Sequence, residues 1–240
     1  FVYMNRNTSS EVQEMQLRSS DCRGFLIFGV EMQREDLQVF IDTGLPFVVL
    51  DNSFQDSDVD SVAINNFQGI SKAMQYAYDM GHREIGYIRC RERITSFSER
   101  YRAYKNYMKK FNLKIKENYI WDVNYSEQTI REEVGKYLSE NKENPTIFIA
   151  ENDFIACHAI HGMQDYGYRV PEDISVIGFD DRPVCQMIVP SVTTVNVPKN
   201  AFGAAAVELL MEKIQNPREY SMKTEIGTKL IVRKSVRKLK

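Results

Sequence analysis

Short apolar runs recur along the chain, separated by longer stretches of mixed character. Each run is nearly continuous in apolar or β-branched residues instead of alternating with polar ones, as in strands that are covered on both faces. The runs lie at residues 25–28, 47–50, 85–88, 146–149 and 174–177. This pattern predicts a parallel sheet with helices on both of its faces.

The stretches between these runs have apolar residues three and four positions apart, the period of an amphipathic helix. They cover residues 34–43, 67–80, 98–111, 127–140, 153–166 and 199–215. Gly44, Gly81 and Gly167 follow three of them, where a helix often ends on a left-handed residue. Ser126 precedes another and is a suitable N-cap. Strands and helices thus alternate, which predicts an α/β fold with right-handed crossovers.

Polar residues directly follow two of the predicted strands. Asp51 and Asn52 come after one strand, and Asp180 and Asp181 come after another. In open α/β sheets, ligands bind outside the carboxyl ends of the strands. These positions are therefore the first candidates for a binding site.

The charge balance argues against a nucleic-acid-binding surface within this chain. The 31 basic and 33 acidic residues give a net charge of -2, whereas DNA-binding modules carry a basic excess that neutralises phosphates. The basic C-terminal stretch 233–240 is interpreted as a solvated terminus. Because no apolar run has membrane-spanning length, no membrane association is expected.

The four cysteines are widely spaced and form no Cys-x-x-Cys pair. They are Cys22, Cys90, Cys157 and Cys185, and they are expected to be reduced thiols of a cytoplasmic protein. Residues 1–4 resemble the middle of a strand and not its beginning, as expected in a fragment of a longer protein. No phosphate loop, nucleophile elbow or metal cluster is present in the sequence, so neither an enzyme nor a cofactor is expected.

One series of motifs resembles the signature of the lac/gal repressor family of bacterial transcriptional regulators. Its main parts are residues 150–156 (AENDFIA) and 167–181 (GYRVPEDISVIGFDD), followed by 190–195 (PSVTTV), 203–210 and 230–236 (LIVRKSV). Upstream, Asp51-Asn52, Gly69, Gly81-His82-Arg83 and Ile85-Gly86 continue it in the expected order. The resemblance covers almost the whole chain.

The resemblance implies a fold like that of periplasmic binding proteins, with two Rossmann-like parallel-sheet subdomains joined by three crossovers. Carried over, the N-terminal subdomain would hold residues 1–63 and 198–218. The C-terminal subdomain would hold 65–195 and 225–240, with the third crossover at 219–224 and a closing strand near 225–237. Family members also have a DNA-binding head, then a first strand and helix, before anything resembling residues 1–4. All of these are missing here.

Four residues carry over as polar ligand contacts, and each also has a structural interpretation. Arg100 would offer a planar fork of donors to hydroxyls, carboxylates or phosphates; without the resemblance it would be a surface arginine beside Glu99. Asp180 would accept hydrogen bonds from two hydroxyls, or cap a turn, with Asp181 the better turn residue. Asn152 and Asp51 are further polar candidates, and Asn152 is also a good N-cap. Replacing Arg100 by alanine is expected to abolish effector binding with little change in the melting temperature.

Aromatic rings would stack on the apolar face of a sugar or a base. Tyr125 matches a family aromatic position, while Phe67 and Phe202 are weaker candidates, because an aromatic residue at helical spacing usually lies in the core. His158 and His161 are three residues apart on one helix, which suits a surface or interface pair better than a metal site. His82 is expected to be structural.

The function implied is that of an effector-binding and dimerisation domain that controls a repressor's operator binding. The effector, a sugar or a related polar metabolite, would bind between the two subdomains of each chain in a homodimer. It would thereby control operator DNA binding through the missing head. Cys157, His161, Met187 and Ile188 are the predicted dimer contacts. The alternative is an extracytoplasmic sugar-binding protein of an ABC importer, which would share the fold.

Overall fold

The computed structural model describes residues 21–54, 56–92, 94–141 and 143–239, and it divides the chain into two compact units. The first unit holds the described chain up to Ile64 together with Pro198–Ile226. The second holds Asn65–Val197 and Gly227–Lys240, so the chain changes unit at three places. The strand predicted at residues 1–4 lies outside the described residues.

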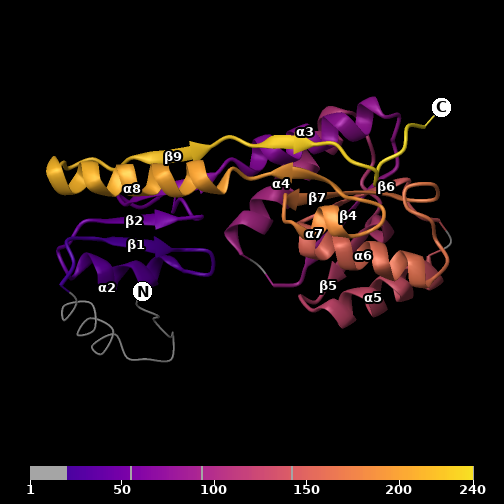
Figure 1. Ribbon diagram of the computed structural model, residues 1–240, viewed down its shortest axis with the longest axis horizontal. Coiled ribbons are helices and arrows are strands. Elements are labelled where there is room, and N and C mark those ends of the chain that lie inside the picture. The colour runs from indigo at the N-terminus through magenta and orange to yellow at the C-terminus, as the bar shows by residue number, and fades with distance from the viewer. Residues whose placement is uncertain (1–20, 55, 93, 142, 240) are drawn as a thin grey trace. The chain divides into compact units, whose positions relative to one another are not determined.

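The first unit contains a four-stranded parallel sheet in the order β1-β2-β3-β9. Its strands are β1 (Phe25–Phe28), β2 (Phe47–Leu50), β3 (Asp60–Ile64) and β9 (Lys223–Ile226), and its helices are η1 (Arg34–Leu37), α2 (Gln38–Ile41) and α8 (Lys199–Gln215). Figure 1 shows β9, in yellow, in this unit although it comes near the end of the chain. β2 is buried on both faces, because Phe47 and Val49 pack with the α2 side while Val48 and Leu50 pack with α8.

The second unit contains a six-stranded sheet in the order β10-β8-β7-β6-β4-β5. Only β10 runs antiparallel to its neighbour. The strands are β4 (Ile85–Cys90), β5 (Ile120–Val123), β6 (Ile147–Ala150), β7 (Ser175–Asp180), β8 (Thr193–Asn196) and β10 (Lys229–Ile231). The helices are α3 (Asn66–Asp79), α4 (Thr95–Lys110), η2 (Glu117–Tyr119), α5 (Glu127–Glu140), α6 (Asp153–Asp165) and α7 (Val184–Met187).

Paired helices cover the two faces of this sheet. α5 packs against α6 on one face, and α3 packs against α4 on the other (Figure 1). β4 shows why its run of apolar residues is continuous: Ile88 lies in the core cluster under α5 and α6, while the ring of Tyr87 lies 4.9 Å from that of Tyr104 on α4. The predicted α/β class and parallel sheets are therefore confirmed.

The structure places one segment differently from the sequence prediction. The closing strand expected near 225–237 in the second subdomain is present there as β10, but β9, which overlaps the start of that range, pairs with β3 in the first unit. Its alternate residues are only partly buried, so its register could not be recognised from an apolar run. The third change of unit consequently lies after Ile226 and not at 219–224.

The helix ends follow the sequence prediction closely. Gly44, Gly81 and Gly167 have φ angles of 67°, 92° and 82°, the left-handed conformation expected of them. The Ser126 hydroxyl accepts a hydrogen bond from the backbone of Thr129 at the start of α5. These caps fix where each helix ends and therefore where the next strand can begin.

Candidate functional site

Four parallel strands of the second unit end at the same edge of its sheet. β7, β6, β4 and β5 are neighbours in that order, and they end at Asp180, Ala150, Cys90 and Val123. Asp180, Asn152 and Tyr125 therefore lie at this edge or directly after it. Arg100 reaches it from α4, the helix that follows β4. The structure thus brings four of the predicted site residues to one part of one unit.

Arg100 is buried at this edge, with only 4% of its surface exposed. Its Nε donates to Asn66 Oδ1 at 2.8 Å, and one terminal nitrogen donates to the backbone oxygen of Glu151 at 2.6 Å. The Asn66 amide nitrogen donates to Glu99 Oε2, which turns the Asn66 oxygen toward the guanidinium. The arginine is therefore held in one orientation before any ligand arrives.

The guanidinium also stacks on an aromatic ring and faces a carboxylate. Its central carbon lies 3.8 Å from the centre of the Phe179 ring. A methyl group at Gly69 would lie 2.5 Å from that ring, so the ring has little room to move away. Asp180 Oδ1 lies 3.5 Å from the Arg100 Nη2, at the outer limit of a hydrogen bond.

Asp180 is the more exposed partner of this pair. Its side chain is 27% exposed, against 5% for Arg100. A planar cation and an accessible carboxylate therefore lie side by side at the sheet edge. This arrangement suits a small molecule that presents both hydrogen-bond acceptors and hydroxyl donors.

The turn after β7 holds Asp180 in an unusual backbone conformation. Asp180 and Asp181 have φ angles of 109° and 50°, and such residues persist only where the surroundings fix them. Asp181 accepts hydrogen bonds from Arg233 at 2.6 Å and from Asn196 at 2.9 Å. Asp181 is thus the turn residue, as the sequence predicted.

Asn152 performs the capping role that was its structural interpretation. Its Oδ1 accepts from the backbone nitrogen of Ile155 at the start of α6. Its Nδ2 donates to the Tyr125 hydroxyl at 3.0 Å. The Tyr125 ring is 40% exposed and packs against Phe154 with 4.7 Å between ring centres. An accessible aromatic ring and a polar amide therefore stand beside the Arg100–Asp180 pair on the same sheet edge.

Asp153 belongs to the site although no sequence pattern predicted it, and its side chain is fully buried behind this edge. Its two carboxylate oxygens accept from the Thr194 hydroxyl at 2.5 Å and from the Arg182 backbone at 2.7 Å. Burial raises the pKa of this carboxyl to about 6, against the hydrogen bonds that lower it. In the sequence, Asp153 is notable only because it follows the N-cap Asn152. An acidic residue is common in the first turn of a helix, so its position predicted no role in the site. Asn66 and Phe179 were missed too.

The three other predicted ligand residues are described each within its own unit. Asp51 and Phe202 belong to the first unit. Phe202 packs beside the core cluster under α8, which supports the core interpretation for it. Phe67 is 44% exposed, and its ring contacts that of Tyr107 on α4 at 5.8 Å. A ligand role for Asp51 and Phe67 stays a prediction.

One predicted dimer contact is wrong. Cys157 lies in the core cluster between α5, α6 and the sheet with 1% of its surface exposed, so it cannot contact a partner. Met187 is 79% exposed, whereas His161 and Ile188 are partly buried. The helix and the apolar turn are adjacent, because Gln164 on α6 donates to the backbone oxygen of Val189.

His82 is structural, as predicted. It is fully buried, its Nε2 donates to the backbone oxygen of Arg237, and its Nδ1 lies 2.8 Å from the Thr146 hydroxyl.

No group of three or more possible metal-binding side chains occurs among the described residues. Within the same residues, no helix combines the length and the apolar character that a membrane crossing needs.

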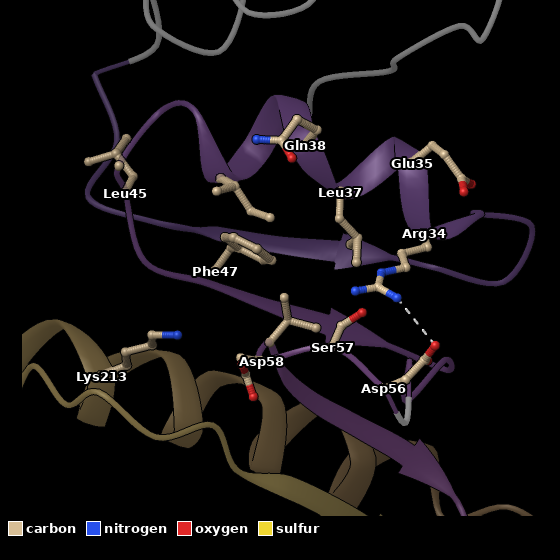
Figure 2. Close-up of a pocket in the computed structure, with 13 residues that line it drawn as sticks. Arg34, Glu35, Leu37, Gln38, Leu45, Phe47, Asp56, Ser57, Asp58 and Lys213 are labelled. Carbon is tan, nitrogen blue, oxygen red and sulfur yellow. Dashed lines mark hydrogen bonds and ion pairs between the residues drawn. The ribbon is translucent and has the colours of Figure 1, made fainter.

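The first unit contains a cavity of about 660 Å³ that none of the predicted site residues lines. Figure 2 shows Leu37 and Phe47 inside it, with Arg34 and Asp56 paired at its rim and Lys213 entering from α8. The Arg34–Asp56 pair is largely exposed. Because the oriented and buried polar groups are in the second unit, we assign the candidate site to the sheet edge there.

The sequence matches the family model of the periplasmic binding protein-like domain over residues 74–236. The HTH-type transcriptional repressor PurR of Actinobacillus pleuropneumoniae is 30% identical over 240 residues, covering 97% of this chain and 71% of the relative. PurR of Klebsiella pneumoniae is 33% identical over 193 residues, covering 80% of this chain and 56% of that protein. The chain thus spans between 56% and 71% of the length of these two relatives.

Solved structures share the fold at lower sequence identity. A regulatory protein of the LacI family from Chloroflexus aggregans gives a TM-score of 0.88 at 24% identity, covering 98% of this chain and 84% of that one. A LacI family transcriptional regulator from Enterococcus faecalis with bound ribose gives 0.82 at 22% identity, covering 98% and 85%. A CelR–cellobiose complex gives 0.83 at 24% identity, covering 94% and 69%.

Proposed function

This chain belongs to the lac/gal repressor (LacI) family of transcriptional regulators, and we propose on that premise that its second unit binds the effector of a repressor. The observation that carries the proposal is the Arg100–Asp180 pair, held at the sheet edge beside Asn152 and Tyr125. The relatives of 30% and 33% identity are repressors, which favours this function over the alternative of an importer's binding protein. The same relatives support a role in regulation.

The chemistry of the site favours a sugar or a related polar metabolite as the effector. The accessible Asp180 carboxylate can accept hydrogen bonds from two hydroxyls of one sugar edge. The Arg100 guanidinium supplies donors to ring or hydroxyl oxygens. The exposed Tyr125 ring offers a face on which an apolar sugar or base face can stack. Structures with bound ribose or cellobiose make sugars useful probes, and the exposed ring makes planar purine bases useful ones too.

The proposed partners are a second copy of the chain and operator DNA. The exposed turn at Met187 and Val189, beside α6, supports a homodimer contact there. Occupancy of the effector site would change operator affinity through a coupling free energy of about 1–3 kcal/mol, or roughly 5- to 150-fold. The free cysteines and the repressor relatives support a cytoplasmic location.

Isothermal titration calorimetry with D-ribose, cellobiose, hypoxanthine and guanine tests the proposal. At least one probe should bind the unmodified protein. Asp180→Asn should weaken a sugar about 10- to 100-fold, because a hydrogen bond to a charged group contributes about 1.5–3 kcal/mol. Asp173→Asn removes a carboxylate from an exposed turn after α6 and is the matched control. Equal loss of affinity in both variants would contradict the assignment of Asp180.

A further inference from the structure

Asp153 connects three parts of the second unit behind the candidate site, and it is fully buried there. It is the first residue of α6, directly after the N-cap Asn152. One carboxylate oxygen accepts from the Thr194 hydroxyl on β8, and the other accepts from the backbone nitrogen of Arg182. Arg182 lies between the end of β7 and α7. The carboxylate is therefore a buried link among α6, β8 and the turn that carries Asp180.

The turn that Asp153 holds is the one that directs the Asp180 carboxylate toward Arg100. Asp180 and Asp181 both have positive φ angles, which non-glycine residues keep only under constraint. Asp181 is fixed on one side by Arg233 and Asn196. The Arg182 backbone bond to Asp153 fixes the next residue of the turn. Both constraints are needed, because a turn fixed at one point can rotate about it.

The strand beneath Asp153 leaves space for this carboxylate and for little else. A methyl group at Gly178 would lie 2.3 Å from Asp153 Oδ1. The carboxylate thus packs directly on the bare backbone of β7, two residues before Asp180. Any rotation of the Asp153 side chain would break its hydrogen bonds to Thr194 and Arg182 at once.

We propose that Asp153 is a positioning residue of the effector site, whose ionised carboxylate holds the turn 180–182 in the conformation that aims Asp180 at Arg100. This role of Asp153 rests on the proposed function, because the site that Asp153 positions is the proposed effector site. Protonation of Asp153 replaces an anionic acceptor by a neutral carboxyl group, which accepts the Arg182 N–H more weakly. The turn is then less firmly held.

The surroundings place the protonation of Asp153 in an accessible pH range. Burial raises the pKa of its carboxyl to about 6, and the nearby Asp180 carboxylate acts in the same direction. The Cys185 thiol on α7 is hydrogen-bonded to this carboxyl and in turn to the Cys157 thiol on α6, and the Asp181–Arg233 pair lies in the adjoining turn. The turn should consequently loosen as the pH falls from 7 to 5.

Nuclear magnetic resonance on the ligand-free protein tests this directly. The backbone amides of Asp180 and Arg182, and the Nε–H of Arg100, should titrate together with a midpoint near pH 6. Asp153→Asn should remove that transition, whereas Asp173→Asn should leave it unchanged. A transition that persists in Asp153→Asn, or is absent at Arg182 in the unmodified protein, would overturn the proposal.

A second variant separates the effect of the carboxylate from a general disturbance of packing. Thr194→Val has nearly the same shape but lacks the hydroxyl that donates to Asp153. Loss of a hydrogen bond to the charged form should move the midpoint upward by about half a pH unit or more. An unchanged or lower midpoint would show that the transition does not report Asp153.

Binding measurements with D-ribose, cellobiose and hypoxanthine at pH 7.5 and 5.5 complete the test. Any of these probes that binds should bind Asp153→Asn about tenfold more weakly at pH 7.5, with a melting temperature equal to or above that of the unmodified protein. The melting temperature should not fall, because asparagine removes a buried charge. If it falls together with the affinity, Asp153 is merely structural and the proposal fails. If no probe binds the unmodified protein, the proposed effector class fails, while the resonance titration still decides the role of Asp153.

Discussion

The contacts of Arg100 could be predicted only in part from the sequence. From the sequence alone it is an arginine beside Glu99, and only the family resemblance indicated a ligand role. The structure shows that Asn66 bridges the two side chains, and that the guanidinium also donates to the Glu151 backbone. No sequence pattern indicates a bridge between residues 34 positions apart. These bonds favour a larger loss of stability on removal of Arg100 than the sequence suggested.

Arg100→Ala should abolish effector binding and also destabilise the protein. Its removal leaves buried acceptors on Asn66 and Glu151 without their donor, which costs about 1–3 kcal/mol. Urea denaturation measures the change in the free energy of unfolding. Arg102→Ala, an exposed position on the same helix, should change it little. Equal stability of the two variants would contradict the bonding described for Arg100.

His82 predicts a pH dependence of stability in the second unit. Burial lowers the pKa of its imidazole from 6.5 to about 4. Because the folded-state pKa is depressed, its stabilising contribution is present above pH 6.5 and is lost as the pH falls through about 4. The loss between pH 7.5 and 4.5 should be about 2–3 kcal/mol.

Urea denaturation of the unmodified protein and of His82→Gln at these two pH values isolates the contribution of His82 to the free energy of unfolding. Asp153 acts in the opposite direction, because its raised pKa makes stability fall as the pH rises from about 4 to 6. The difference between the two proteins cancels that contribution. A pH dependence that is the same in both would show that His82 does not titrate as described.

At the scale of elements, strands with continuous apolar runs were predicted well, and strands with polar residues were missed. β2, β4 and β6 are buried on both faces and stand out in the sequence. β3 begins with the buried residues Asp60 and Ser61, and Asp60 can be buried because it pairs with Arg218 and Lys213. Such partners lie far away in the sequence and give no local signal. β8 is similar, since its buried threonines bond to Asp153 and Arg233.

Asn152→Ser separates the two roles of the residue that begins α6. Serine is as good an N-cap as asparagine, so the free energy of unfolding should change by less than about 0.5 kcal/mol. Its hydroxyl is too short to keep the contact with Tyr125, so affinity for a bound sugar should fall several-fold. Asn152→Ala should lower both affinity and stability, the latter by about 1 kcal/mol. Unchanged affinity in Asn152→Ser would confine Asn152 to capping.

At the scale of the whole molecule, the family resemblance supplied what local patterns could not. Strand and helix periodicity gave the α/β class, but it could not show that Pro198–Ile226 returns to the first unit. Pairing between β3 and β9 joins residues about 160 positions apart, for which a single sequence carries no evidence. The site residues Arg100, Tyr125, Asn152 and Asp180 came from the same resemblance. Asp153 was missed because its role depends on β7 and β8.

In the proposed homodimer, the exposed turn after α7 contacts the second copy of the chain, and a substitution there tests this contact. Val189 is 81% exposed, so Val189→Glu should leave the melting temperature nearly unchanged while weakening a contact between copies. Sedimentation velocity should show a shift from dimer to monomer. Tyr220→Glu, at an exposed position of the first unit, is the control. A dimer fully retained in Val189→Glu would exclude this turn from the contact.

Chemical-shift mapping of the isotope-labelled protein, titrated with D-ribose, cellobiose and hypoxanthine, tests the location of the effector site most directly. The proposed site predicts that a bound probe perturbs the resonances of Arg100, Tyr125, Asn152 and Asp180 together, at one saturating concentration. Perturbations confined to Leu37, Phe47 and Val59, which line the cavity of the first unit, would contradict it.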